Sequence, residues 1–136
     1  MASNIYTAGL NNVGSYQVSG IPYATGSLDA SSGMEIIFPY VTQWITFVNH
    51  ETGVGNHLYV GFSENGVNNS SNYFRVGPQG AAEGSQNLTI NVKVSRIYLS
   101  GSGDCDIIAG LTNLPVQRVD NIAPSGSSWS GSAGVG

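Results

Sequence analysis

The stretch MEIIFPYVTQWITFVNHETGVGNHLYVGFSENG, residues 34–66, carries the densest strand signal in the chain. Residues 41–49 are rich in β-branched and aromatic side chains, and residues 57–63 place a leucine, a valine and a phenylalanine on one face at period two. The connection between them, residues 51–56, contains two glycines, a length and composition typical of a loop between antiparallel strands. We therefore predict a β-hairpin at the centre of a β-sheet domain.

Further strand patterns follow outward from this centre at short, fairly regular spacing. No segment shows a sustained 3.6-residue period, and residues 64–71 are predicted as a polar loop with Asn65-Gly66 as its turn. Pro39 predicts a kink of the kind found where a strand changes sheets. The eight predicted strands are residues 23–28, 35–38, 41–49, 57–63, 72–76, 87–94, 96–100 and 104–111. This series predicts an all-β protein, an antiparallel β-sandwich, and favours a jelly roll among the sandwiches.

The domain organisation follows from where the strand patterns begin and end. We expect residues 21–115 to form one β-sandwich domain. Residues 1–20 mix Asn, Gly and Ser with isolated apolar side chains, so we expect an extended arm or an edge strand. Residues 116–136 are rich in Gly and Ser and are expected to form an extended tail.

The composition is poor in charge. Charged residues make up 9% of the 136 residues, against about 25% in ordinary domains, and the net charge is -4. Such a surface is more typical of a protein packed in an assembly than of a free monomer. One lysine and three arginines provide no basic patch, so nucleic acid is not an expected partner. No apolar run approaches the roughly 20 residues that span a bilayer, and the first residues lack a secretory pattern, so we expect no membrane association.

Residues that could carry chemistry are few. His50, Glu51 and His57 flank the central loop, but their spacing matches no metal-ligand signature, and we expect no metal. Asp104 and Asp106 would point to one side of a strand as a possible acid and base, yet two carboxylates without a cleft are weak evidence. Cys105, the single cysteine, alternates with apolar positions and is expected to be a small buried core residue. We predict no catalytic residues, no cofactor and no enzymatic activity.

The aromatic residues support a second interpretation. Exposed tyrosines or a tryptophan on a sandwich can stack on sugar rings, whereas aromatic residues that alternate within strands pack in the core or an interface. We favour packing because most of these residues alternate within strands. The set comprises Tyr16, Tyr23, Tyr40, Trp44, Tyr59, Tyr73, Phe74, Tyr98 and Trp129.

The segments YVTQWITFVN, LYVGFSENGV, YFRV, KVSRIYLSG and AGLTNLP, followed by SSWSGSAGVG, together resemble small virion structural proteins of tailed bacteriophages. The resemblance runs from about residue 14 to residue 136, and no single motif is diagnostic. It implies a capsid decoration or cement protein that sits on the outside of an icosahedral head and clamps adjacent major capsid subunits. It also implies a location on the capsid exterior after assembly in the host cytoplasm, and it carries over no catalytic residues.

The function predicted from the sequence is therefore a non-enzymatic capsid decoration protein that binds the major capsid protein and forms a homo-oligomer, with a trimer expected from lattice symmetry. Two alternatives remain: a carbohydrate-binding or adhesive module of a tail or fibre, and a self-assembling jelly-roll shell protein. Sparse apolar residues on flexible backbone suit contacts that order on binding. The candidate partner contacts are Ile5, Tyr6, Leu10, Val13, Trp129 and Val135.

Overall fold

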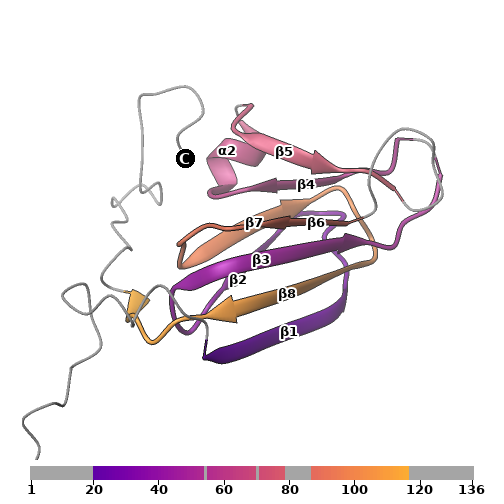
Figure 1. The fold of residues 1–136 in the computed structure, drawn as a ribbon. Coiled ribbons are helices and arrows are strands. Elements are labelled where there is room, and N and C mark those ends of the chain that lie inside the picture. Colours follow the sequence, from indigo (N-terminus) through magenta and orange to yellow (C-terminus); the bar gives the residue numbers. More distant parts are fainter. Residues whose placement is uncertain (1–19, 54, 70, 79–86, 117–136) are drawn as a thin grey trace, which may run out of the picture.

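The computed structural model describes residues 20–53, 55–69, 71–78 and 87–116. Within them the chain forms two four-stranded antiparallel sheets packed face to face, with very little helix (Figure 1). The prediction of an all-β antiparallel sandwich is confirmed. Apart from their innermost residues, the expected N-terminal arm and C-terminal tail lie outside the described residues.

The two sheets differ in the length of their strands. The first, which we call sheet A, contains the three longest strands and one short one, in the order β1 (Ile21–Leu28), β8 (Cys105–Leu111), β3 (Thr42–Asn49) and β6 (Asn87–Ile90). The second, sheet B, contains β2 (Met34–Ile37), β7 (Arg96–Ser100), β4 (Leu58–Gly61) and β5 (Tyr73–Val76), in that order. Each of the eight predicted strands corresponds to one of these.

The strands pair from the two ends of the series inward. Strand β1 pairs with β8, β2 with β7, β3 with β6 and β4 with β5, and every pair is antiparallel. The pairs β3–β8 and β4–β7 then complete the two sheets. The last residues of β1, β3, β5 and β7 and the first residues of β2, β4, β6 and β8 therefore lie at one end of the sandwich, the right-hand end in Figure 1.

The core lies between the inward faces of the two sheets. Phe47 from sheet A packs edge-to-face on Phe74 from sheet B, with ring centroids 5.7 Å apart. Ile45, Ile107 and Leu99 are fully buried beside them. Removing a side chain of this kind typically costs about 2–5 kcal/mol, because the cavity does not close.

The predicted central hairpin is wrong. Strands β3 and β4 are consecutive, but β3 pairs with β8 and β6 in sheet A, whereas β4 pairs with β5 and β7 in sheet B. The loop of residues 51–56 therefore crosses from one sheet to the other. A glycine-containing loop between two strand patterns fits both a hairpin and such a crossing, and the choice depends on distant partners that local sequence does not contain.

The predicted polar loop at residues 64–71 is also wrong in part, because it contains a short helix, α2 (Glu64–Asn68). Ser63 is the N-cap, and its Oγ accepts a hydrogen bond from the backbone N–H of Gly66 at 2.9 Å. Val67 packs against Gly61 of β4 so closely that an added Cβ on Gly61 would lie 2.6 Å from the Val67 side chain. Tertiary packing, not local propensity, stabilises this helix. No helix among the described residues is long and apolar enough to cross a membrane.

Strand β6 is shorter than the predicted strand at residues 87–94. Beyond Ile90 the chain leaves the ladder and bonds to Thr42 instead, whose Oγ1 donates to the Val92 carbonyl at 2.6 Å and accepts from the Val94 N–H at 3.1 Å. The kink predicted at Pro39 is found between β2 and β3, where the chain passes from sheet B to sheet A.

Candidate functional site

The outer face of sheet A carries very little charge. Its four strands contain a single charged side chain, Asp106. The register aligns three outward rows across the sheet, because residues directly opposite each other on paired strands share a face. These rows are Ala24–Ile108–Thr46–Thr89, Pro22–Gly110–Trp44 and Asp106–Val48–Asn87.

Ile108 stands at the centre of this face. It is 43% exposed although it lies on β8, an inner strand of the sheet. Its inward neighbour Ile107 is fully buried, so the alternation along β8 is clear. A large exposed apolar side chain in the middle of a sheet face is a feature of interaction surfaces.

Several polar groups of this face already have partners within the chain. The Thr46 and Thr89 hydroxyls lie 2.7 Å apart across β3 and β6 and bond to each other. Asp106 accepts a hydrogen bond from the backbone N–H of Ser27 at 2.8 Å and pairs with His50 Nε2 at 2.6 Å. Covering the face would therefore leave few polar groups without a partner, which keeps the cost of desolvation low.

The Asp106 site depends on an irregularity in β1. The pairing of β1 with β8 shifts between Thr25 and Leu28, and Ser27 adopts a left-handed backbone with φ 54°. This bulge turns the Ser27 N–H toward the carboxylate. The hydrogen bond from Ser27, followed by that from His50, lowers the pKa of Asp106 below its ordinary value. Asp106 is therefore ionised at neutral pH and does not have the raised pKa of a general acid.

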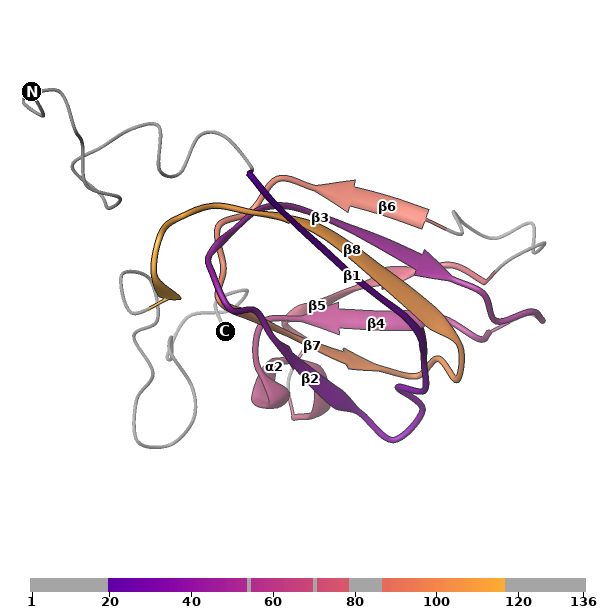
Figure 2. The same ribbon diagram turned by 90° about the horizontal axis from the view of Figure 1, so that it is seen from below.

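The outer face of sheet B differs in both cover and chemistry. Helix α2 lies on it beside β4 and β7 (Figure 2), and Asn68 of the helix contacts the Tyr98 hydroxyl at 3.4 Å. Tyr98 points outward, yet it is only 9% exposed. Arg96, on the same strand, pairs with Glu35 of β2 at 3.5 Å.

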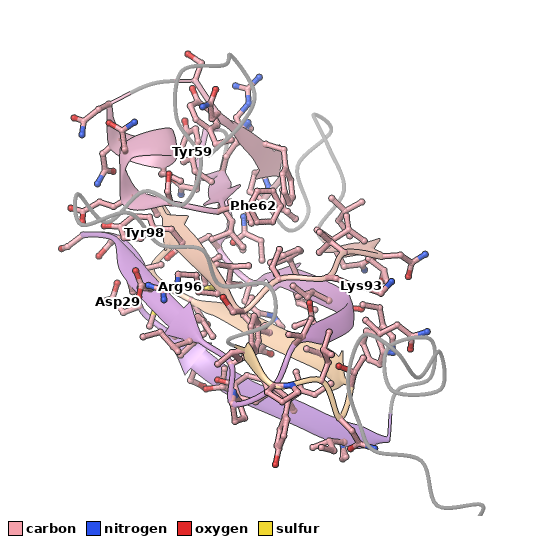
Figure 3. The ribbon with its side chains drawn as sticks, turned by 90° about the vertical axis from the view of Figure 1, so that its left-hand side faces the viewer. Asp29, Tyr59, Phe62, Lys93, Arg96 and Tyr98 are labelled. Carbon is pink, nitrogen blue, oxygen red and sulfur yellow. The ribbon has the colours of Figure 1, made fainter. Side chains whose placement is uncertain are left out.

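Two further tyrosines on sheet B form the most exposed aromatic pair. Tyr59 of β4 and Tyr73 of β5 pack edge-to-face with centroids 5.2 Å apart, and Tyr73 is 38% exposed. Figure 3 shows Tyr59 together with Tyr98 and Arg96 of the neighbouring strand. The backbone of Gly101 comes close to the Tyr59 ring, where a Cβ would lie 2.6 Å from it. Tyr59 is thus held in place, and Tyr73 presents a ring to solvent.

The histidines and acids at the loop end of the sandwich serve structural contacts. Glu51 accepts a hydrogen bond from the Gly103 N–H at 3.1 Å, while His50 pairs with Asp106. His57 does not join them: its Nδ1 is buried and has no hydrogen-bond partner among the described residues. In the part of the chain that the structure describes, no three His, Cys, Asp or Glu side chains gather closely enough to hold a metal ion.

Asp104 and Cys105 are also accounted for by structure. The Asp104 carbonyl accepts a hydrogen bond from the His50 N–H at 2.9 Å, in the turn before β8. Cys105 is fully buried, as expected for a core residue, and burial, followed by the charges of Asp106 and Asp104, raises the pKa of its thiol to about 11. A thiol of this kind is a poor nucleophile at neutral pH.

A buried amide connects these loops to both sheets. Asn49, at the end of β3, is fully buried. Its Oδ1 accepts hydrogen bonds from the Ser102 hydroxyl at 2.9 Å and the Glu51 N–H at 3.1 Å. Its Nδ2 lies within hydrogen-bonding distance of three carbonyls, those of Asn56 (3.0 Å), Val76 (3.1 Å) and Gly77 (3.3 Å).

The predicted partner contacts Ile5, Tyr6, Leu10, Val13, Trp129 and Val135 lie outside the described residues, so the structure does not test them. The outer face of sheet A was not identified from the sequence. The signal was present, since residues 21–28, 42–49, 87–90 and 105–111 contain one charge between them, but nothing local indicates that these segments share a sheet.

Comparison of the sequence with protein-family models, with curated proteins and with solved structures gives no match in any of the three.

Proposed function

We propose that this chain is a non-enzymatic virion protein that binds the outside of an icosahedral head and stabilises contacts between major capsid subunits. The observation that carries the proposal is the outer face of sheet A, which is nearly free of charge, has Thr46, Thr89 and Asp106 paired within the chain, and therefore suits burial in an assembly. A face of this kind favours contact with another protein surface over contact with water. The charged fraction of 9% supports the same view for the chain as a whole.

The strand order supports a jelly-roll assignment. Pairing β1 with β8, β2 with β7, β3 with β6 and β4 with β5 amounts to one long antiparallel ribbon wrapped into two sheets. Eight-stranded jelly rolls recur in viral capsid proteins and in lectins. This is an argument from fold alone, and it is compatible with all the functions considered for this chain.

The proposed mechanism requires no chemistry. A head filled with DNA fails where subunits meet, and a protein that binds two adjacent subunits adds buried area across that seam. The sandwich provides a rigid body, and the segments 1–19 and 117–136 carry the apolar residues proposed to contact neighbouring subunits.

The test is co-sedimentation of the purified chain with heads assembled from the major capsid protein encoded in the same genome. We expect saturable binding and a higher temperature of head disruption. A chain lacking residues 123–136 should bind more weakly, because it lacks Trp129 and Val135. As a matched control, Asn113→Ala alters an exposed loop residue and should leave binding unchanged. Absence of binding by the full chain would rule out the proposal.

The tyrosine pair on sheet B favours one second candidate, a glycan-binding module. Tyr73 is 38% exposed and its ring is oriented by Tyr59, an arrangement suited to stacking on a sugar. This function predicts millimolar to micromolar binding to a glycan, lost in Tyr73→Ala. Tyr40→Ala is the matched control, since Tyr40 is 40% exposed on the β2–β3 connection. A glycan array with no ligand, or equal binding by both variants, would remove this candidate.

The remaining alternative is a shell protein that assembles by itself. It predicts very large closed particles from the purified chain alone, which light scattering at micromolar concentration would detect. A small, discrete oligomer would exclude it and favour the decoration function.

A further inference from the structure

We infer that the outer face of sheet A packs against the same face of a second copy, giving a twofold dimer centred on the row Ala24–Ile108–Thr46–Thr89. The inference deepens the proposed function by naming the surface that makes the homo-oligomer, and it rests on that function for its biological setting.

Charge is the first reason for choosing a second copy as the occupant. In a twofold contact residue i of one copy meets residue j of the other and j meets i, and only residues on the axis meet their own equivalents, so a charge at the centre of the face would meet a like charge. Sheet A has only Asp106, which lies with Val48 and Asn87 in the row next to the central one and already pairs with His50. The same contact through sheet B would bring Glu35, Arg75 and Arg96 into the interface.

The second reason is the cost of covering the face. A partner with charged side chains would have to desolvate them against a surface that offers no free counter-charge in its central row. The same face of a second copy has no charged side chain in its central row, so this desolvation cost does not arise there. The Thr46 and Thr89 hydroxyls share one hydrogen bond at 2.7 Å, and Ala24, Ile108 and Trp44 contribute apolar area.

The size of the face predicts the strength of the dimer. Four strands about 4.8 Å apart and about seven residues long cover roughly 450 Å² per copy, or about 900 Å² in total. This is below the roughly 1,200–2,000 Å² of stable specific interfaces and in the range of weak, transient ones, so association should be reversible and no tighter than micromolar. On a capsid, where copies are held close together, such an affinity is sufficient for pairing. The contact closes at two copies and therefore replaces the trimer expected from lattice symmetry.

The test measures the mass of the full-length chain by sedimentation equilibrium between about 1 and 500 μM, with wild type, Ile108→Asp and Ile37→Asp. Ile37 is the matched control, because it is an isoleucine 62% exposed on sheet B. We expect a monomer–dimer equilibrium in wild type and Ile37→Asp, and a Kd at least about tenfold higher in Ile108→Asp, because each copy would bury a carboxylate at the twofold axis. Circular dichroism and melting of each variant show whether it is folded. Should Ile108→Asp fail to fold, Ala24→Arg on the exposed edge strand β1 tests the same row.

A second readout places the contact on the molecule. The chain has two tryptophans, so in a Trp129→Phe background the fluorescence reports Trp44, which lies on this face in the row with Pro22 and Gly110. Its emission should shift to shorter wavelength as the dimer forms, and Ile108→Asp should remove the shift.

Several outcomes would overturn the inference. These are a monomer throughout the concentration range, a trimeric mass, equal weakening by Ile37→Asp, or dimerisation without a change in Trp44 emission. A monomer whose Trp44 emission moves to longer wavelength when residues 1–19 are deleted would show that the chain covers its own face. A monomer that still binds heads would leave the proposed function intact, whereas a dimer that fails to bind them would retain this contact and remove that function.

Discussion

The two outer faces of the sandwich are built from the same kind of strand and differ in almost everything else. Sheet A has longer strands, one charged side chain and a bare Ile108, 43% exposed. Sheet B has shorter strands, three charged residues and the helix α2, under which the outward Tyr98 is 9% exposed. Among the described residues, α2 therefore covers part of the outer face of sheet B, and no described helix lies on that of sheet A. Strand pattern fixes which side chains point inward, but what lies over the outward ones decides where a protein can bind.

The largest effect is expected where the two sheets are connected. Asn49→Ala should lower the free energy of unfolding by about 3 kcal/mol, because it removes several hydrogen bonds and leaves buried carbonyls of sheet B without donors. Urea denaturation followed by tryptophan fluorescence measures the change. Asn87→Ala, an exposed asparagine on sheet A, is the control and should stay within about 0.5 kcal/mol of wild type. Similar values for the two variants would show that Asn49 does not hold the sheets together.

A smaller effect is expected from adding one methyl group to sheet B. In Gly61→Ala the new Cβ would lie 2.6 Å from Val67 and 3.0 Å from the Asn72 carbonyl, so α2 must move. We expect a loss of about 2 kcal/mol in unfolding free energy. Ala24→Val adds two methyl groups to the outer face of sheet A, and there we expect a change within about 0.5 kcal/mol. Chemical denaturation at a concentration too low for self-association compares them. Equal losses would mean that sheet A is as closely covered as sheet B.

These two faces also show what the sequence can and cannot predict. All eight strands were found because alternation and β-branched content are local signals, and residues 96–100 and 104–111 match their strands almost residue for residue. The central hairpin failed because residues 51–56 look the same whether the chain turns back or crosses the core. Partner strands lie far away in sequence, and more than one strand order in the sheets would bury the hydrophobic face of each strand.

The candidate surface depends on the same missing information. Helix α2 is stabilised by the packing of Val67 against Gly61. The helix propensity of residues 64–68 does not predict this contact. The uncharged face of sheet A exists because four uncharged segments, distant in sequence, become neighbours. Each segment alone gave no reason to select Ile108 or Ala24. The histidines and acids, in contrast, were visible at once, and the structure uses His50, Glu51 and Asp106 to hold loops and a bulge.

The smallest expected effect concerns the single charge of sheet A. The pKa of Asp106 is lowered in the folded chain, so its bonds to Ser27 and His50 stabilise the fold at pH values above the ordinary carboxylate pKa, and this stabilisation is lost as the pH falls through the lowered value. The side chains of His50 and Asp106 are about a third exposed (36% and 35%). Screening by solvent should therefore limit the contribution of their ion pair to stability to less than about 1 kcal/mol. Asp106→Asn should therefore be less stable than wild type between about pH 5 and 7, and the difference should shrink as the pH falls below the ordinary carboxylate pKa of about 3.9. Melting temperatures measured across this range test it against Asp104→Asn, which keeps the Asp104 carbonyl that His50 uses. If the two variants gave the same pH profile, the Asp106 contacts would contribute nothing to the fold, and the bulge of β1 would need another explanation.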